Sequence, residues 1–430
     1  MQQTIRHIKG PIRTKVTIPG SKSITYRALL LASLAEGVSE ISGIHICQDT
    51  KLLINALHQL GIVTQLDEKS RSCIIAGCNG KFPKKQANLW CNDTIAIARF
   101  LMTACSATSG VFYFDGSAVL REKPITHLLN ILVQQGAQII PTDTYKMPFT
   151  LVGADTLEGG EIIIDRTISN QLISALLMIS PYARSPFTFS ILEPINQSYT
   201  DMTCSMMAEF GVLVHRVHQG QFMVPVPQRY HARDYNVEPD FSIASYFFAA
   251  ASVTGGEITI QPIKRNQTKQ INAKFLSVLE KMGCRVIETH TGLTLKSPGE
   301  LQGIEVSMRD FSDAFLALTA IAPFAKSPTL ISHINHMRPK ELERMSIMKS
   351  ELIKMGIHVE SGHDWIKIFP STPQGDIVNT HHDRHIAMAF SIIGLKIPDV
   401  IIENAECIDN VYPEFFTIWN QLGEQVNISV

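Results

Sequence analysis

Six segments of the chain are apolar around nearly the whole circumference of a helix. They read YRALLLASLAEG, IARFLMTACSATSG, QLISALLMISPYA, ASYFFAAASVTGG, AFLALTAIAPFA and IAMAFSIIGLK. A helix without a polar face is usually buried on all sides. The pattern therefore predicts six buried helices, spread along the whole length of the chain.

A second series of helices alternates with the first and is amphipathic. Each of these helices runs into a glycine and then into a short β-like stretch; the glycines are Gly61, Gly136, Gly211, Gly283, Gly356 and Gly423. Their spacings are 75, 75, 72, 73 and 67 residues. Glycine commonly ends a helix in the left-handed conformation, and a fixed period indicates a repeat architecture. We predict six α/β units, grouped three and three with a boundary near residue 240.

Polar residues stand directly before each of the six buried helices. The stretches read SKSITYR, CNDTIAIAR, DRTISNQ, EPDFSIAS, RDFSDAF and HHDRHIAM. The first turn of a helix has unpaired N–H groups and a partial positive charge, so helix starts of this kind suit an anion. The six helix starts are therefore the places where we expect the chemistry.

Composition narrows the class of protein. With 430 residues, the chain is too long for one ordinary core and indicates two domains or more. A net charge of −1 without a basic tail argues against nucleic acid as a partner, and no apolar run reaches the roughly 20 residues of a membrane span. Eight scattered cysteines without CxxC, and a start without an apolar core, indicate a cytoplasmic protein with reduced thiols.

The motifs at the helix starts resemble those of the enolpyruvyl transferases, and most closely the 5-enolpyruvylshikimate-3-phosphate synthase family. The similar stretches are PGSKSITYRALLLASLAEG, SNQLISALLM, YTDMTCSMMAEFGV, IASYFFAAASVTGG, SDAFLALTAIAPFA and RPKELERM. The resemblance implies an α/β fold, a two-domain inside-out α/β barrel of six βαβαββ repeats, three per domain. One domain would be residues 22–239, and the other would combine 1–21 with 240–430. The buried helices would point their N-termini into an interdomain cleft that closes on the substrates.

The same resemblance implies a reaction. The family transfers the enolpyruvyl group of phosphoenolpyruvate to the 5-hydroxyl of shikimate 3-phosphate and releases phosphate, in the shikimate pathway of aromatic amino acid biosynthesis. Both substrates are polyanions, which explains a site rich in lysine, arginine and helix starts. The hydroxyl needs a carboxylate to take its proton, and the methylene carbon needs an acid. The resemblance implies no metal or organic cofactor and a monomer, with neither nucleic acid nor membrane as partner.

Individual residues receive roles from the resemblance. The catalytic residues would be Lys22, Asp313 and Glu341. Shikimate 3-phosphate would be bound by Lys22, Ser23, Arg27, Ser169, Asn170, Asn196 and Lys340. Phosphoenolpyruvate would be bound by Lys22, Lys123, Gln171, Arg344, Arg384 and His385.

The chain departs from the family pattern mainly among the phosphoenolpyruvate residues. Ile95 stands where the family has a glycine, Lys123 replaces an arginine, Asn410 replaces a lysine, and the Asp-His-Arg motif reads Asp-Arg-His at 383–385. Lysine keeps the charge of arginine but loses its bidentate fork. A unit charge 4 Å from a phosphate oxygen is worth about 4 kcal/mol at an effective dielectric of 20. The departures therefore predict weakened use of phosphoenolpyruvate.

Three alternatives stay open. The chain could be a divergent paralogue that binds a phosphorylated small molecule or uses another acceptor. It could be a UDP-N-acetylglucosamine enolpyruvyl transferase. That family usually carries a loop cysteine in the region that corresponds to DGSAVLREKP, and this stretch contains none. A metal enzyme could use His381 and His385, which have i, i+4 spacing, together with His382 and Asp383. No second ligand pair is evident for that metal site.

Overall fold

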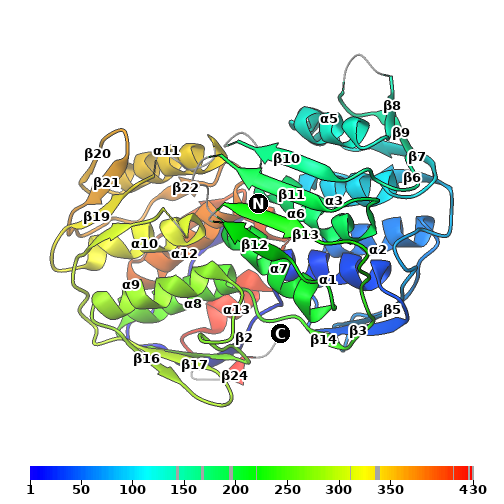
Figure 1. Ribbon diagram of the computed structural model, residues 1–430. Helices are drawn as coiled ribbons and strands as arrows, with labels where there is room; N and C mark the ends of the chain where they lie inside the picture. Colours follow the sequence, from blue (N-terminus) through cyan, green and yellow to red (C-terminus); the bar gives the residue numbers. More distant parts are fainter. Residues whose placement is uncertain are drawn as a thin grey trace. The chain divides into compact units, whose positions relative to one another are not determined.

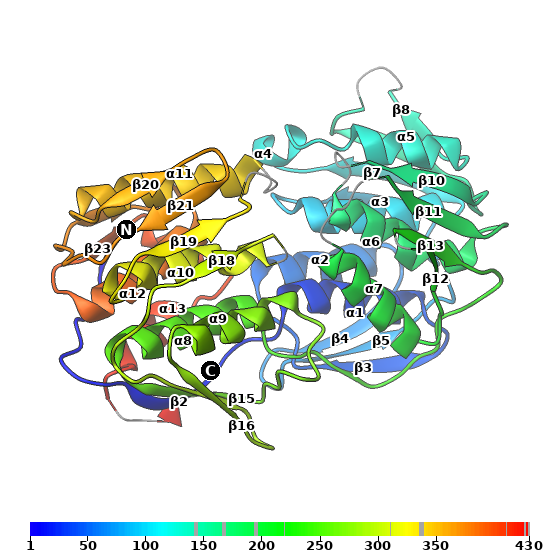
Figure 2. The ribbon, with the colours of Figure 1, turned by 60° about the vertical axis from the view of Figure 1, so that its left-hand side comes forward.

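The chain forms two compact units. The computed structural model describes residues 1–430 except 142–144, 166–168, 193–196, 219, 310, 335–338, 410, 425–426 and 429–430. Unit 1 combines Met1–Pro19 with Glu238–Val430, and unit 2 is Gly20–Val237. Figures 1 and 2 show the elements of both units.

Unit 2 consists of three repeats. The first contains β14 (Tyr235–Asn236), α1 (Lys22–Leu34), β3 (Val38–Ser42), α2 (Gln48–Gln59), β4 (Val63–Asp67) and β5 (Ser72–Ala76). The second contains β6 (Gln86–Trp90), α3 (Ile95–Ser106), β7 (Gly110–Asp115), α4 (Ala118–Arg121), α5 (Thr126–Gln134), β8 (Gln138–Ile140) and β9 (Phe149–Gly153). The third contains β10 (Gly160–Ile164), α6 (Asn170–Ile179), the 3₁₀ helix η1 (Ser180–Tyr182), β11 (Phe187–Ile191), α7 (Ser198–Glu209), β12 (His215–His218) and β13 (Gln221–Val224).

Unit 1 also contains three repeats. The first includes β2 (Arg13–Thr17), α8 (Phe241–Thr254), β15 (Glu257–Gln261), η2 (Ile271–Lys274), α9 (Phe275–Lys281), β16 (Arg285–Glu288) and β17 (Leu293–Lys296). The second includes β18 (Glu305–Ser307), η3 (Ser312–Ala314), α10 (Phe315–Ile321), η4 (Ala322–Phe324), β19 (Thr329–Ser332), α11 (Pro339–Lys354), β20 (Val359–Ser361) and β21 (Trp365–Ile368). The third includes β22 (Ile377–Asn379), α12 (Arg384–Lys396), β23 (Ile401–Glu403), η5 (Ala405–Ile408), α13 (Phe415–Gln421), β24 (Asn427–Ile428) and β1 (Gln2–Thr4).

The sheets confirm the predicted βαβαββ repeat. In the second repeat of unit 2 the strand order is β6-β7-β9-β8, with β6 and β7 parallel and the other pairs antiparallel. Four other sheets contain the same arrangement. The last repeat of unit 1 differs, because β24 pairs with β2 in another sheet and β1 joins β23 instead.

Two strands reach their sheets from far along the chain. The first strand of the first repeat in unit 2 is β14, which pairs in parallel with β3. The corresponding strand in unit 1 is β2, near the N-terminus, which pairs in parallel with β15. The sheet of unit 2 is therefore closed by a strand from the C-terminal end of that unit, and the sheet of unit 1 by a strand that precedes the whole of unit 2 in the chain.

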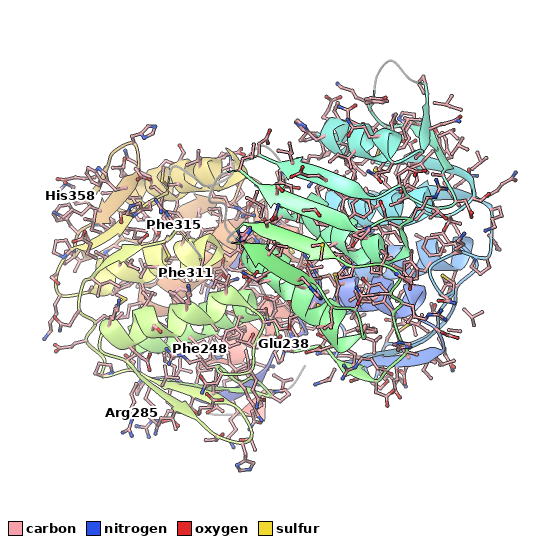
Figure 3. All side chains as sticks on the ribbon, viewed as in Figure 1. Glu238, Phe248, Arg285, Phe311, Phe315 and His358 are labelled. Carbon is pink, nitrogen blue, oxygen red and sulfur yellow. The ribbon has the colours of Figure 1, made fainter. Side chains whose placement is uncertain are left out.

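The six predicted apolar helices are buried, as expected. In unit 2 they are α1, α3 and α6, and in unit 1 they are α8, α10 and α12. In unit 1 the three helices pack against one another (Figure 1). Their apolar side chains, among them Phe248 and Phe315, belong to one continuous core (Figure 3). A separate core forms around the helices of unit 2.

Five of the six predicted glycines end their helices in the left-handed conformation. Gly61, Gly136, Gly211, Gly283 and Gly356 have φ between 80° and 105°. Gly423 does not, so the prediction was wrong at this position. The chain leaves α13 through Leu422 and a turn in which Glu424 N–H donates to Gln421 O, which needs no left-handed residue.

Gly356→Ala tests the conformational need for glycine without a steric clash. A methyl group at Gly356 would meet no atom within 4 Å, but φ is +80°. We expect the free energy of unfolding to fall by about 1–2 kcal/mol, because alanine disfavours the left-handed region. Gly10→Ala is the matched control, since Gly10 also has open space but no positive φ. Urea unfolding curves of the two variants would contradict this explanation if their midpoints moved equally.

Candidate active site

Lys22, the first residue of α1, is held by a carboxylate on the neighbouring helix. Its Nζ forms an ion pair with Asp49 Oδ2 and lies 5.7 Å from the centre of the Tyr26 ring. The other oxygen of Asp49 accepts a hydrogen bond of 2.6 Å from Thr94, the residue before α3. Asp49 thus joins the starts of two buried helices.

The charge of Asp49 is stabilised in the folded chain. Burial on its own works to raise the pKa of this carboxyl. The charge of Lys22 and hydrogen bonds from Lys22, Thr94 and Tyr26 outweigh that effect, so the pKa of Asp49 lies below its ordinary value. At neutral pH the carboxylate is therefore ionised and fixes the lysine ammonium group.

Arg27 lies one turn further along α1 and is 3% exposed. It donates to the backbone oxygen of Ser23 at 2.9 Å, to Thr203 Oγ1 at 2.7 Å and to Ser174 Oγ at 2.9 Å. Burial lowers the pKa of Arg27 to about 10, which still leaves it charged at neutral pH. Its guanidinium connects α1 with α6 and α7.

A second arginine links α3 with the start of α6. Arg99 donates to Ser169 Oγ at 2.8 Å, to Gln171 Oε1 at 3.1 Å and to the backbone oxygen of Pro124 at 3.0 Å. Ser169 is the N-cap of α6 and also accepts from the Leu172 N–H. Arg99, a buried cation, therefore orients Ser169 and Gln171, two residues that are predicted to bind the substrates.

The other described residues of unit 2 that the sequence analysis names lie near the same helix starts. Ser23 and Asn170 are half-buried in the first turns of α1 and α6. Lys123 is exposed and follows α4, directly before the Pro124 whose oxygen Arg99 contacts. Ile95 begins α3 and is half-buried. Asn196 lies outside the described residues.

In unit 1, Asp313 lies in η3, directly before the buried helix α10. Its Oδ2 is 3.4 Å from Nδ2 of Asn272 in η2. The same amide nitrogen donates to Ser242 Oγ, in the first turn of α8, at 2.7 Å. The predicted base is thus connected to the start of a second buried helix.

A second polar cluster surrounds the start of α12. Arg344 on α11 donates from Nε to Asp383 Oδ2 at 2.7 Å, and Asp383 Oδ1 caps α12 by accepting from the His385 N–H at 2.8 Å. His385 Nδ1 lies 3.2 Å from the hydroxyl of Tyr246 on α8. Arg384 is half-buried beside them.

The Tyr246 hydroxyl stays protonated in this cluster. Burial raises the pKa of Tyr246 well above its ordinary value, and Arg344 opposes the rise while Asp383 and Asp313 add to it. The tyrosine is therefore a neutral hydrogen-bonding partner for His385. It also shows that Asp313 and Arg344 share one region of unit 1.

Some predicted residues fall outside the described part of the chain. Lys340 and Glu341 lie in the first turn of α11, but the description excludes their side chains. Asn410 is also outside it. Their predicted roles rest on the sequence alone.

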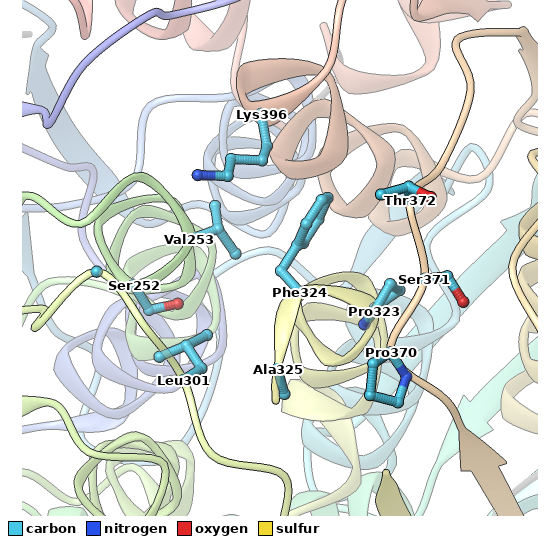
Figure 4. A pocket seen from close by; sticks show the side chains of 11 residues that line it. Ser252, Val253, Leu301, Pro323, Phe324, Ala325, Pro370, Ser371, Thr372 and Lys396 are labelled. Carbon is cyan, nitrogen blue, oxygen red and sulfur yellow. The ribbon is translucent and has the colours of Figure 1, made fainter. Parts of the chain in front are cut away.

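A hollow of about 480 Å³ in unit 1 lies at the opposite ends of the buried helices (Figure 4). Its walls include Ser252 and Val253 near the end of α8, Phe324 after α10, and Lys396, the last residue of α12. Asp313 precedes α10, and Asp383, Arg384 and His385 precede or begin α12. The hollow is therefore distinct from the candidate site.

The described residues form no group of three or more histidine, cysteine, aspartate or glutamate side chains suited to a metal ion. His381 and His385 therefore belong to no such group in that part of the chain. All eight cysteines are free thiols, as the sequence predicts. Within the described chain, no helix combines the length and apolar character of a membrane span.

Several polar residues of these clusters carry no signal strong enough to identify them from the sequence. They are Asp49, Ser174, Thr203, Tyr246 and Asn272, all of them partners of the predicted residues. Asp383 belongs to the motif at 383–385, but nothing in the sequence pairs it with Arg344. Asp49 and Asp383 resemble ordinary residues of helix first turns and N-caps. Only the folded structure reveals which cation each carboxylate contacts.

Known proteins with similar sequences point to one activity. A family model described as EPSP synthase (3-phosphoshikimate 1-carboxyvinyltransferase) matches residues 7–419. A 3-phosphoshikimate 1-carboxyvinyltransferase from Trichormus variabilis is 39% identical over 412 residues, covering 95% of this chain and 96% of the relative. One from Methanosphaerula palustris is 35% identical and covers 98% and 99% of the two chains.

Solved structures show the same fold. EPSP synthase from Acinetobacter baumannii superposes with a TM-score of 0.85 at 23% identity, over 99% of this chain and 98% of the other. The match of nearly the whole sequence to the family model, and the identity to curated relatives, decide the assignment. The chain belongs to the EPSP synthase (3-phosphoshikimate 1-carboxyvinyltransferase) family.

Proposed function

We propose that this chain transfers the enolpyruvyl group of phosphoenolpyruvate to the 5-hydroxyl of shikimate 3-phosphate and releases inorganic phosphate. The observation that carries the proposal is full-length similarity to relatives with this activity in their names, at 34–39% identity. The helix starts of both units supply the cations and carboxylates that such a reaction needs.

The reaction requires three proton movements. When the acceptor oxygen bonds to the enolpyruvyl carbon, its proton must leave and the methylene carbon must gain one, which makes it a methyl group. Loss of phosphate together with one proton of that methyl group then restores the double bond. We assign the first task to Asp313, whose carboxylate lies next to an amide donor. We assign the second to Glu341 together with Lys22, on the basis of the resemblance.

Binding of the two polyanions falls to the remaining predicted residues. Lys22, Ser23, Arg27, Ser169, Asn170, Asn196 and Lys340 are proposed for shikimate 3-phosphate. Lys22, Lys123, Gln171, Arg344, Arg384 and His385 are proposed for phosphoenolpyruvate. Hydrogen bonds to charged groups orient a phosphate or carboxylate most strongly when the donors are already fixed. Asp49 fixes Lys22, and Asp383 fixes Arg344, before any substrate arrives.

We also propose that units 1 and 2 are the two three-repeat domains of the family, and that the chain works as a cytoplasmic monomer. The three βαβαββ-type repeats in each unit support the first proposal. Free thiols at all eight cysteines support a reducing compartment.

Purified protein given shikimate 3-phosphate and phosphoenolpyruvate should release phosphate and form an equal amount of the enolpyruvyl product. Colorimetric phosphate detection and mass spectrometry measure the two products. Lys22→Ala should lower kcat/KM at least about 100-fold, since a charge near both substrates is lost. Absence of phosphate release by the unmodified chain would favour the paralogue that binds but does not react.

Lys123→Arg tests whether the departure at this position weakens phosphoenolpyruvate binding. A planar guanidinium can bind a carboxylate or phosphate with two parallel hydrogen bonds, which an ammonium group cannot. We expect the KM for phosphoenolpyruvate to fall about 3- to 10-fold, while the KM for shikimate 3-phosphate stays the same. Lys146→Arg, at another exposed lysine of unit 2, is the control and should change neither constant. An equal effect on both substrates would refute the assignment of Lys123.

Asp49→Asn removes the carboxylate that holds Lys22 and should weaken both stability and activity. Because the folded-state pKa of Asp49 lies below 3.8, the stabilisation is fully present above that pH and is lost as the pH falls through the lower folded-state value. We expect the variant to lose about 1–3 kcal/mol at pH 7. The difference from the unmodified chain should shrink below about pH 3.8, as urea unfolding at several pH values would show.

Asp155→Asn is the matched control for Asp49→Asn. Asp155 forms an ion pair with Lys81 in the same unit, but both side chains are about half exposed. Exposed pairs of this kind contribute little to stability, so this variant should unfold like the unmodified chain. If Asp49→Asn behaves in the same way at every pH, the ion pair with Lys22 has no energetic role.

A further inference from the structure

Asn272 connects the predicted base Asp313 with the start of α8. Its Nδ2 donates to Ser242 Oγ at 2.7 Å and lies 3.4 Å from Asp313 Oδ2. The residue is 4% exposed. Three segments that are distant in the sequence therefore meet at one amide group.

The segment that carries Asn272 is tightly fastened to the chain before α8. Gln270 Oε1 accepts from the Phe241 N–H at 3.0 Å, and its Nε2 donates to Pro239 O at 2.8 Å. Glu238 accepts from the Lys269 N–H at 3.0 Å and from the Thr268 hydroxyl. The backbone on the N-terminal side of Asn272 is thus fixed, and the amide has a defined position.

The orientation of the amide follows from its neighbours. Turned the other way, Asn272 would place Oδ1 next to the carboxylate oxygen of Asp313, and the two oxygens would repel each other. In the observed orientation both neighbouring oxygens face the N–H groups, and Oδ1 is buried with no hydrogen-bond partner among the described residues. Buried polar atoms without partners are rare and need a reason. Here the reason is that Nδ2, the hydrogen-bond donor of the amide, faces the carboxylate of Asp313. Oδ1 must then point the other way, where no donor lies within reach in the described chain.

We propose that Asn272 is a positioning residue for the reaction, which keeps the Asp313 carboxylate oriented so that it accepts the proton of the acceptor hydroxyl. The inference rests on the proposed function. A neutral amide suits this task, because an adjacent lysine or arginine would stabilise the anion so strongly that it would become a poor base. A second carboxylate in its place would favour the protonated, inactive form.

Other charged groups share this region and remain unchanged in the test below. Besides burial, nearby charges affect the pKa of the Tyr246 hydroxyl on α8. These charges are Arg344 on α11, Asp383 and Arg384 at the start of α12, and Asp313 itself. His385 contacts the same hydroxyl. A change that is confined to Asn272 therefore reports on the amide alone.

Asn272→Asp and Asn272→Ala test the proposal through the pH dependence of kcat/KM and through the titration of Asp313 itself. In Asn272→Asp, the acid limb of the kcat/KM profile should move to higher pH by about one unit or more, because the introduced carboxylate lies next to the carboxylate of Asp313. In Asn272→Ala, kcat should fall about 10-fold or more with a smaller upward shift, since only a hydrogen bond to the charged form is lost. Circular dichroism checks the fold, and the isosteric aspartate variant remains informative if the alanine variant does not fold.

Asn420→Ala is the matched control. Asn420, on α13 of the same unit, also has a buried Oδ1 without a partner in the described chain, but no contact with Asp313. This variant should leave the acid limb unmoved. An equal shift in Asn420→Ala would mean that the effect is structural and would overturn the proposal.

Carbon-13 NMR of labelled aspartate side chains measures the titration midpoint of Asp313, whose signal is assigned by its loss in Asp313→Asn. This measurement separates the positioning role of Asn272 from the proposed function of the chain. If the unmodified chain does not react, the proposed function fails, yet the Asp313 midpoint still reports on Asn272. A midpoint that rises in Asn272→Asp and Asn272→Ala supports the positioning role. A midpoint that is equal in all variants overturns it, whether or not phosphate is released.

Discussion

Complete burial of six helices is the constraint on which the rest of this structure depends. Along a buried helix, every polar side chain needs a partner in the helix itself or on an element packed against it. Ser33, Thr103, Ser245, Thr319 and Ser391 do so by donating to the backbone oxygen four residues earlier. Only the first turns keep N–H groups without intrahelical partners. Polar chemistry is therefore confined to the helix starts, where Lys22, Ser169, Asp313 and Asp383 lie or from which they extend.

The cations at these helix starts do not stand alone. Lys22 is paired with Asp49, and Arg344 is paired with Asp383. Arg27 contacts neutral oxygens instead. A buried cation next to a carboxylate is fixed in place but loses part of its attraction for a substrate anion, whereas one surrounded by hydroxyls and amides keeps it. Arg27, with neutral partners, is therefore a stronger source of positive potential than the carboxylate-paired Lys22.

Periodic features were predictable from the sequence, and pairwise contacts were not. The all-apolar helices and five of the six glycine ends follow from local rules that depend on only a few neighbouring residues. The partners of the site residues depend on which helix faces lie against each other. Thr203 is 176 residues from Arg27, and Asn272 is 41 residues from Asp313. No pattern within one helix specifies such a pair. The last repeat was also less regular than its sequence suggested, because its final strand pairs in another sheet.

The two strands that close their sheets from a distant part of the chain affect how the protein is made. All segments of unit 2 are available once residue 237 has left the ribosome, including β14. The first sheet of unit 1 can form only later. Its strand β2 emerges first, but the strand with which it pairs, β15, is made only after more than half of the chain has been synthesised. During that interval the N-terminal segment has an open edge of backbone N–H and C=O groups. Translation speed and chaperone binding during synthesis should therefore influence the yield of unit 1 more than that of unit 2.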